Sequence, residues 1–330
     1  MEKLYDARGN RYLVADPQTI RNRGVALPGG PEAAAASWRD WTTTAIDAFC
    51  RAPAGAGAKP YLSDGLLVGP FEETAPFNLL IVNTDGSLAE RSGNGLTIFT
   101  TALADFGLVD RGQSAALFVH HATGALRTDV ELGESGGHIG IWVSMGEAAF
   151  GPGAVRAAPD TYGPGIFGGA DCSNVPALNA LDPRWSGSQF VSVGNPHCVT
   201  FLDDAGHLPS NDDLHAEPLH GLLTQIANAR DAAGNNGRVS PAGINLQWAA
   251  VTGPNRIAAR VFERGEGPTL SSGTSATAVA AAAMRLGLVT GPEIEVVMPG
   301  GTAPITAVWH GESLQLRLFG VAGPVPLQLR

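Results

Sequence analysis

The sequence has no excess of basic residues. Its 330 residues include 21 lysines and arginines against 31 aspartates and glutamates, so the formal net charge at pH 7 is −10. Proteins that bind nucleic acid usually carry a basic patch or stripe, and the sequence contains neither. Anionic lipid surfaces also attract basic clusters. The composition therefore disfavours both nucleic acid and a membrane surface as partners.

Long apolar runs and paired cysteines are also missing. No stretch approaches the 18 apolar residues of a membrane span, and the segment 276–283 is only a short Ala/Thr/Val run. Residues 1–6 lack the apolar run of a signal peptide. Cys50, Cys172 and Cys198 are odd in number and lack metal-ligand spacing, which indicates a reducing compartment. We therefore expect a cytoplasmic protein without a metal site.

The length and the apolar fraction are those of a globular protein of two domains. A chain of 330 residues exceeds one average domain, and 44% of the residues are hydrophobic. Such a chain can bury a proper core.

Two segments 180 positions apart resemble each other. Seven of the twenty positions in 90–109 are identical to their counterparts in 270–289, including Ser92-Gly93 with Ser272-Gly273. Each copy is predicted to be a Ser-Gly turn that opens a helix, which a later glycine closes. The first turn of a helix offers unpaired N–H groups and a partial positive charge, so each copy suits a carboxylate or a developing anion.

The segments around the two copies follow the same order of strands, polar turn, helix and hairpin. Strands are predicted at residues 12–16, 64–68, 77–82, 115–121, 124–130, 138–145, 190–193, 244–248, 257–262, 293–298, 303–309 and 313–319. Helices are predicted at residues 37–51 and 212–229, and loops at residues 28–36, 52–60 and 230–243. The Gly/Pro-rich stretch 151–187 is expected to be irregular. Internal duplication is therefore the organising feature of the chain.

Five short motifs, in order, resemble the diaminopimelate epimerase family, a set of cofactor-independent amino-acid epimerases. They are Asn83-Thr84-Asp85-Gly86-Ser87, Ser92-Gly93-Asn94-Gly95, Val193-Gly194-Asn195-Pro196-His197-Cys198, Glu263-Arg264-Gly265 and Ser272-Gly273-Thr274. With Gly9-Asn10, the resemblance covers nearly the whole chain.

The resemblance implies an α/β fold of two pseudo-symmetric domains, each a mixed β-sheet wrapped around a central helix. It places residues 1–136 with 320–330 in one domain and 137–319 in the other. It further implies a site between the domains, no cofactor, a small amino-acid substrate and a homodimer.

The family's functional residues carry over by motif. The predicted catalytic residues are Ser92, Ser272, His197 and Glu263, with His197 as partner of the first serine and Glu263 as partner of the second. The predicted substrate-binding residues are Asn10, Asn83, Gly93, Asn94, Asn195, Asn245, Glu263, Arg264, Gly273 and Thr274. The implied reaction removes the Cα proton on one face and returns one on the other, which inverts the configuration.

The sequence departs from the family at both acid/base positions, where the family carries cysteine and this chain carries Ser92 and Ser272. A serine hydroxyl is a weaker acid than a thiol by roughly five pKa units, on the order of 7 kcal/mol, and a partner base offsets only part of this. Neighbouring positions depart too: Ser275 and Thr277 replace a glycine and a small residue, and Pro268 replaces an acidic residue. This pattern indicates a natural divergent branch.

Several functions stay open at this point. The leading hypothesis is epimerisation of LL- to meso-diaminopimelate by proton relay through the serines. Alternatives are an isomerase or dehydratase acting on another amino acid, and an inactive homologue that binds an amino acid. A serine hydrolase built on Ser92 and His197 is disfavoured because no supporting carboxylate can be identified.

Overall fold

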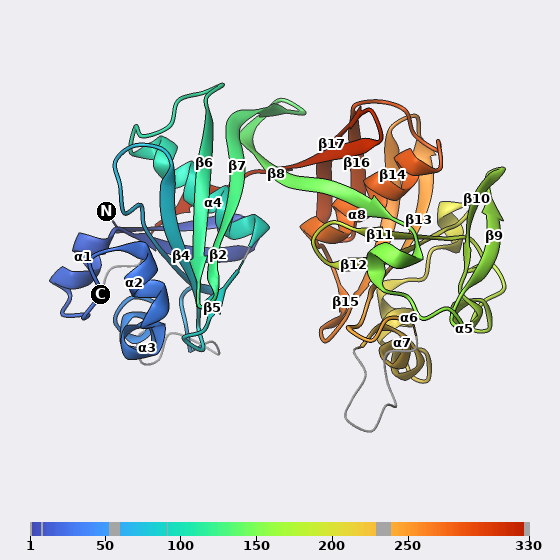
Figure 1. The fold of residues 1–330 in the computed structure, drawn as a ribbon, viewed down its shortest axis with the longest axis horizontal. Helices are drawn as coiled ribbons and strands as arrows, with labels where there is room; N and C mark the ends of the chain where they lie inside the picture. The colour runs from blue at the N-terminus through green and yellow to red at the C-terminus, as the bar shows by residue number, and fades with distance from the viewer. Residues whose placement is uncertain (1, 8, 53–59, 91, 229–238, 327–330) are drawn as a thin grey trace. The chain divides into compact units, whose positions relative to one another are not determined.

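The computed structural model of the chain describes residues 2–7, 9–52, 60–90, 92–228 and 239–326. It divides into two compact units, Met1–Ser144 with Phe319–Arg330 and Met145–Leu318, which we call the first and second units (Figure 1). The change from one to the other falls at residues 144 and 145, whereas the sequence placed it at 136 and 137. It lies inside strand β8 (His138–Phe150), so no loop or turn marks the boundary.

The first unit is a mixed sheet with helices between its strands. Its strands are β1 (Glu2–Ala7), β2 (Asn10–Ala15), β3 (Gly65–Val68), β4 (Phe77–Asn83), β5 (Leu88–Ala89), β6 (Ser114–His121), β7 (Gly124–Ser135) and β19 (Gly323–Val325). Its helices are α1 (Pro17–Asn22), α2 (Pro31–Ala36), α3 (Trp38–Phe49) and α4 (Gly93–Asp105). Strand β1 pairs antiparallel with β2 and β19, β2 runs parallel to β3, and β4 pairs antiparallel with β3 and β5. Strand β4 also runs parallel to β6, which pairs antiparallel with β7.

The second unit repeats this pairing step for step. Its strands are β9 (Gly163–Phe167), β10 (Ala170–Asn174), β11 (Ser188–Ser192), β12 (Pro196–Phe201), β13 (Asn245–Gly253), β14 (Arg256–Glu263), β15 (Gly267–Thr269), β16 (Glu293–Met298), β17 (Gly301–His310) and β18 (Ser313–Gly320). Its helices are α5 (Pro176–Asn179), α6 (Asn211–His215), α7 (Leu219–Ala227) and α8 (Gly273–Arg285), with short 3₁₀ turns η1 (Pro152–Val155) and η2 (Ala205–His207). Strand β11 pairs antiparallel with β12, β12 runs parallel to β13, and β14 pairs antiparallel with β13 and β15. Strand β14 runs parallel to β16, which pairs antiparallel with β17. The predicted internal duplication and mixed α/β fold are confirmed.

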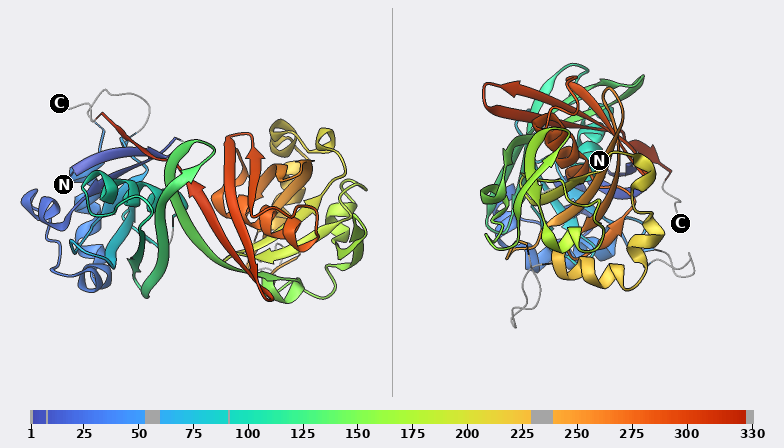
Figure 2. Two further views of the ribbon diagram at one scale, coloured as in Figure 1. Left: turned by 90° about the horizontal axis from the view of Figure 1, so that it is seen from above. Right: turned by 90° about the vertical axis from the view of Figure 1, so that its right-hand side faces the viewer.

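One helix occupies the middle of each unit. Helix α8 contacts strands β11, β12, β13, β14, β16 and β17, and Figures 1 and 2 show it enclosed by those strands. Residues Ala276–Ala283 of this helix are fully buried, because small side chains allow strands to approach on every side. Helix α4 lies in the same way against β1, β2 and β7 of the first unit.

A second apolar layer covers the other face of each sheet. In the first unit, helices α1 to α3 bury Ile20, Trp41 and Ile46 against the outer faces of β2, β3 and β4. In the second unit, helices α5 to α7 bury Leu178 and Leu223 against Cys198 and Trp248. Successive residues of a strand face opposite sides, so each central strand feeds both layers.

The structure adds strand β1 at residues 2–7, for which no element was predicted, and corrects three local predictions. Residues 31–36 form helix α2, which begins at Pro31, where a missing N–H costs nothing. The stretch 151–187 is not irregular, because β9 and β10 make a hairpin around Gly168 and Gly169, both with positive φ. The helix predicted at 212–229 is two helices, since Pro218 has no N–H to continue the first. Most of the loops predicted at 52–60 and 230–243 lies outside the described residues.

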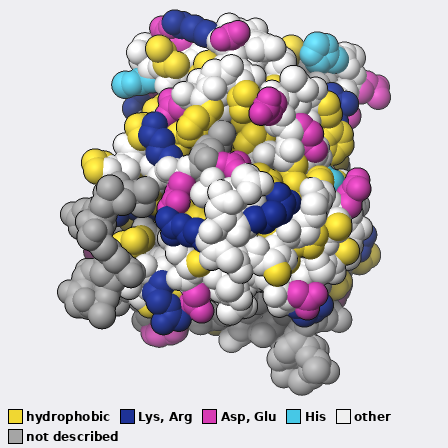
Figure 3. All heavy atoms as spheres, turned by 90° about the vertical axis from the view of Figure 1, so that its left-hand side faces the viewer, with side chains coloured by type: hydrophobic (Ala, Val, Ile, Leu, Met, Phe, Trp, Pro, Cys, Tyr) yellow, Lys and Arg dark blue, Asp and Glu magenta, His cyan; other side chains and the backbone are white. Residues whose placement is uncertain are grey.

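The distribution of surface charge and the length of the helices are the two properties that the composition addressed. Basic and acidic side chains are interspersed on the face shown in Figure 3. No described helix has both the length and the apolar character needed to cross a membrane.

Candidate active site

The two repeated helices begin with the same hydrogen bonds. Ser92 is the N-cap of α4, and its Oγ accepts from the Gly95 N–H at 3.0 Å. Ser272 is the N-cap of α8, and its Oγ accepts from the Ser275 N–H at 3.3 Å. Both serines have extended backbones, which suits an N-cap. Each cap leaves the N–H groups of the next two residues, Gly93-Asn94 and Gly273-Thr274, without a partner inside the helix. Each unit therefore has a hydroxyl beside two donors at a positive helix end.

The two helices also end alike. Gly107 and Gly287 have φ of +71° and +68°, the left-handed conformation that glycine adopts without strain. The next residues, Leu108 and Leu288, donate their N–H groups back to Leu103 and Ala283 at 2.9 Å each. These are the closing bonds expected of a glycine C-cap, so the sequence prediction of both ends is confirmed.

In the second unit the serine hydroxyl is paired with a carboxylate. Ser272 Oγ donates to Glu263 Oε1 at 2.7 Å. Glu263 ends strand β14, and the short strand β15 returns the chain to Ser272 nine residues later. Because the hydroxyl proton already points at an acceptor, a proton that arrives at Oγ can displace it onto the carboxylate. The predicted pair of Glu263 with the second serine is thus present within one unit.

In the first unit the group beside the serine is a phenol. Tyr12 lies on β2, is 7% exposed, and interacts through its hydroxyl with Ser92. Burial raises the pKa of Tyr12, and the Ser92 hydroxyl partly opposes that shift. Gly65 leaves the space for this ring, since a Cβ there would lie 2.8 Å from a ring carbon of Tyr12 and 2.5 Å from the Val82 carbonyl oxygen.

His197 is enclosed within the second unit. Its side chain is fully buried on β12, with Nε2 2.8 Å from Asn195 Oδ1 and Nδ1 3.0 Å from Gln247 Nε2. Burial lowers the pKa of the ring to about 3, and the charge of Arg264 adds to the lowering. The ring is therefore neutral near pH 7. Its proposed partnership with Ser92 joins residues of different units and stays a prediction.

The polar residues predicted to hold the substrate divide between the units. In the second unit, Asn245 Oδ1 accepts from the Arg264 N–H at 3.0 Å, and the Arg264 guanidinium donates to the Ala242 carbonyl at 2.7 Å. Asn195, Asn245 and Arg264 thus follow one another around the ends of β12, β13 and β14.

In the first unit, Asn83 Nδ2 donates to Ser87 Oγ at 3.0 Å, which turns its carbonyl oxygen the other way. The Oδ1 atom of Asn10 is buried without a hydrogen-bond partner among the described atoms. A buried amide oxygen of this kind is an acceptor ready for a donor such as an ammonium group.

Three side chains near these residues were not predicted to belong to the site. Tyr12 reads in the sequence as an ordinary strand residue, and Gln247 as one more residue of an alternating strand. Ser275 carried a signal, because it departs from the glycine expected after Gly273. Gln247 Nε2 donates to Ser275 Oγ at 3.1 Å, and both side chains are fully buried.

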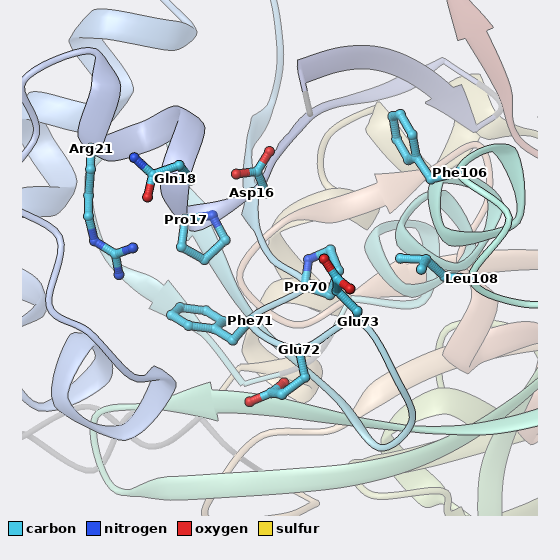
Figure 4. Close-up of a pocket in the computed structure, with 10 residues that line it drawn as sticks. All are labelled: Asp16, Pro17, Gln18, Arg21, Pro70, Phe71, Glu72, Glu73, Phe106 and Leu108. Atoms are coloured by element: carbon cyan, nitrogen blue, oxygen red, sulfur yellow. The ribbon is translucent and has the colours of Figure 1, made fainter.

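A separate cavity in the first unit contains none of the predicted residues. It measures about 430 Å³ and is lined by the residues drawn in Figure 4, among them Asp16, Arg21, Phe71 and Glu72. Arg21 donates to the carbonyls of Leu27 and Pro28, and Glu72 accepts from the Asn78 side chain. These charged groups hold the local backbone. Elsewhere among the described residues, no three His, Cys, Asp or Glu side chains lie together as metal ligands would.

Comparison with known proteins identifies the family. The diaminopimelate epimerase family model matches residues 189–316. Diaminopimelate epimerase 2 of a Nostoc species is 31% identical over 299 residues, covering 90% of this chain and 85% of that protein. Diaminopimelate epimerase of Burkholderia thailandensis is 33% identical over 283 residues, covering 84% and 86%.

A solved structure shows the same fold at lower identity. The phenazine biosynthesis protein of the PhzF family from Bacillus anthracis aligns over 98% of this chain and 96% of that chain, with a TM-score of 0.53 and 14% identity. The predicted family, fold and enzyme class are confirmed together: this protein belongs to the diaminopimelate epimerase family and is an isomerase of the amino-acid epimerase type.

Proposed function

We propose that the protein epimerises diaminopimelate between its LL and meso forms, with serine in place of both family cysteines. Ser272 and Glu263 act on one face of the substrate Cα, and Ser92 acts on the other. The observation that carries the proposal is the hydrogen bond from Ser272 Oγ to Glu263 Oε1 at the start of α8. The repeat of that helix start at Ser92 supports the second role.

A relay removes the main objection to serine. Ionising a serine hydroxyl to a free alkoxide costs on the order of 7 kcal/mol more than ionising a cysteine thiol, since the hydroxyl is a weaker acid by roughly five pKa units. In a relay, Oγ of Ser272 takes the Cα proton while its own proton passes to Glu263 Oε1. The Cα–H and Oγ–H bonds break, two O–H bonds form, and the electron pair stays on the substrate. No alkoxide forms, and the carboxylate is the net base.

The helix starts stabilise the charge that develops. As Cα loses its proton, negative charge moves onto the oxygens of the adjacent carboxylate. The N–H groups of Gly93-Asn94 and Gly273-Thr274 are the donors assigned to that carboxylate. Ser92 then gives its hydroxyl proton to Cα from the second face and takes a proton from the Tyr12 hydroxyl with which it interacts. The O–H bonds of Ser92 and Tyr12 break, a C–H bond and a new Ser92 O–H bond form, and the negative charge passes to the Tyr12 phenol, which water protonates again. We further propose that Asn10, Asn83, Asn195, Asn245 and Arg264 hold the remaining charged groups, as an α-amino acid with a second ionic end requires.

Solvent exchange of the α-proton tests the proposal. The purified chain is incubated with LL- and meso-diaminopimelate in D2O, and deuterium at Cα and configuration are followed by NMR and chiral chromatography. We expect exchange with inversion. Ser272→Ala and Glu263→Gln should each lower the rate about 10²- to 10⁴-fold, the range of general acid–base contributions. Ser271→Ala, at the exposed neighbouring position, is the matched control and should keep the rate.

Other outcomes separate the alternatives. Exchange without inversion would contradict the proposal, because the proton would then leave and return on the same face of Cα. Loss of water from a β-hydroxy amino acid would identify a dehydratase. Calorimetric binding with no exchange would leave an amino-acid-binding homologue.

A further inference from the structure

A chain of hydrogen bonds runs through the interior of the second unit from α8 to the turn before β12. It links Ser275, Gln247, His197 and Asn195 at distances of 3.1, 3.0 and 2.8 Å. The first three side chains are fully buried, and only Asn195 reaches the surface. We call these four residues the buried amide chain.

The direction of each bond follows from what each group can do. The amide nitrogen of Gln247 only donates, so Nδ1 of His197 must accept. A neutral imidazole that accepts at Nδ1 carries its proton on Nε2. Nε2 therefore donates to Asn195 Oδ1, and the NH2 group of Asn195 is left to face away from the chain. The hydroxyl of Ser275 thus influences the orientation of the Asn195 amide, three side chains further along.

The orientation of Gln247 is the less costly of two. As placed, both of its N–H bonds have acceptors, His197 Nδ1 and Ser275 Oγ, and only Oε1 lacks a partner among the described atoms. Turning the amide over would satisfy the oxygen and leave two buried N–H donors unpaired. An unpaired buried N–H is rarer in proteins than an under-satisfied carbonyl. Ser275 is thus the acceptor that the second N–H needs, and the glycine expected at this position would not supply it.

The amide oxygen of Asn245, like that of Asn195, is occupied by a donor of the protein. Asn245 lies opposite His197 in the parallel pairing of β12 and β13, and its Oδ1 is taken by the Arg264 N–H. Two neighbouring strand ends therefore carry amides whose NH2 groups remain as donors, and the charge of Arg264 acts on the same region through His197. Donors with a positive charge match an anionic oxygen, above all a carboxylate.

We propose that Ser275, Gln247 and His197 are positioning residues that fix the Asn195 amide with its NH2 toward the ligand, so that Asn195 donates to a substrate carboxylate. The choice of a carboxylate-bearing amino acid rests on the proposed function. The hydrogen-bond directions within the chain do not. In this arrangement the neutral His197 ring positions Asn195 and does not act as the base for Ser92.

The first test measures the tautomer directly. Imidazole ¹⁵N NMR on the full-length protein, with the His197 signals identified by their loss in His197→Gln, should show the proton on Nε2 and an unprotonated Nδ1 between pH 5 and 9. A proton on Nδ1, or titration of this ring within that range, would overturn the proposal. The spectrum is recorded without ligand. It therefore tests the hydrogen-bond directions of the buried amide chain even if the protein does not turn over diaminopimelate.

The second test measures binding of LL- and meso-diaminopimelate by calorimetry. Asn195→Asp keeps the acceptor for His197 but removes the NH2 group and adds a charge, and should weaken binding at least tenfold. Ser275→Ala should weaken it about fivefold, and Ser275→Thr, which keeps the hydroxyl, should restore it. Thr200→Val is the control and should change affinity less than twofold, because its buried hydroxyl bonds Ser188 on the other face of β12.

Kinetics separate positioning from simple structural damage. If turnover is present, Ser275→Ala should raise KM and leave kcat nearly unchanged, since the Asn195 contact is the same in ground and transition states. Unchanged affinity in both Asn195→Asp and Ser275→Ala would contradict the proposal. Failure of the wild-type chain to bind or exchange diaminopimelate, with the Nε2–H spectrum intact, would instead contradict the proposed substrate and retain the positioning chain.

Discussion

Acidification from pH 7 to pH 5 should destabilise the protein, in large part through the buried ring of His197. His197 has its pKa lowered from an ordinary 6.5 to about 3 in the folded chain. Above pH 6.5 the ring is neutral in both folded and unfolded states, so this histidine does not change the free energy of unfolding. As the pH falls from 6.5 toward 3, the unfolded histidine binds a proton that the buried one does not. Proton binding then stabilises the unfolded state relative to the folded state. At pH 5 the solution is about 1.5 units below the pKa of the unfolded histidine. At 1.36 kcal/mol per unit, the free energy of unfolding is therefore lower than at pH 7 by ~2 kcal/mol.

Urea titrations followed by tryptophan fluorescence at pH 7 and pH 5 would measure this loss. His197→Gln should be less stable than the wild type at pH 7 but should lose about 2 kcal/mol less on acidification. His310→Gln, an exposed site in the same unit, is the control and should retain the wild-type pH dependence. Equal pH dependence in the wild type and His197→Gln would refute the reasoning, because the ring would then titrate alike in both states.

Three further predictions follow from features of the fold and the site. The double variant Ser92→Cys with Ser272→Cys should raise the epimerisation rate about tenfold or more, since a thiol at a helix start ionises far more easily than a hydroxyl; no gain in the α-proton exchange assay would show that the surrounding pocket has been remade. Gly65→Ala should cost about 1–3 kcal/mol in chemical denaturation, because its Cβ would press on a strand carbonyl and an aromatic ring, whereas Gly30→Ala has open space around it and should cost less than 1 kcal/mol. Ser210→Ala removes the capping box of α6 and should cost about 1 kcal/mol by the same measurement, with Ser210→Asp recovering most of it.

The parts of the fold that the sequence predicted are those that repeat or alternate. Helices α4 and α8 carry a start signal at Ser92 and Ser272 and a stop signal at Gly107 and Gly287, so their limits could be read directly. Central strand β4 contains the apolar run 79–82, and β14 is apolar from 257 to 262 except for Arg260; polar turns follow both strands. Both kinds of signal are local, and tertiary packing reinforces them.

The missed elements depend on partners far away in the chain. Strand β1 is short and half polar, and it is ordered by pairing with β2 and with β19, more than 300 residues later. The hairpin of β9 and β10 is rich in glycine and proline, and only its pairing makes it a strand pair. The break between α6 and α7 was signalled by Pro218, whose effect was underestimated.

The candidate site shows the same division. Motif order located Glu263 and Ser272, and their hydrogen bond follows from a nine-residue return through β15. The role of Gln247 could not be predicted, because a glutamine in an alternating strand has no signature of what it will face. Only the register of β12 against β13, with His197 beside Asn245 and Val199 beside Gln247, brings that amide next to the imidazole.

The pairing of β1 with β19 also fixes the order in which the chain can be completed during synthesis. Every residue of the second unit leaves the ribosome before Gly323–Val325, the strand that finishes the edge of the first. The second unit can therefore fold while the first unit still lacks strand β19. A nascent chain released before Gly323 would contain the whole second unit and would leave β1 without its β19 partner.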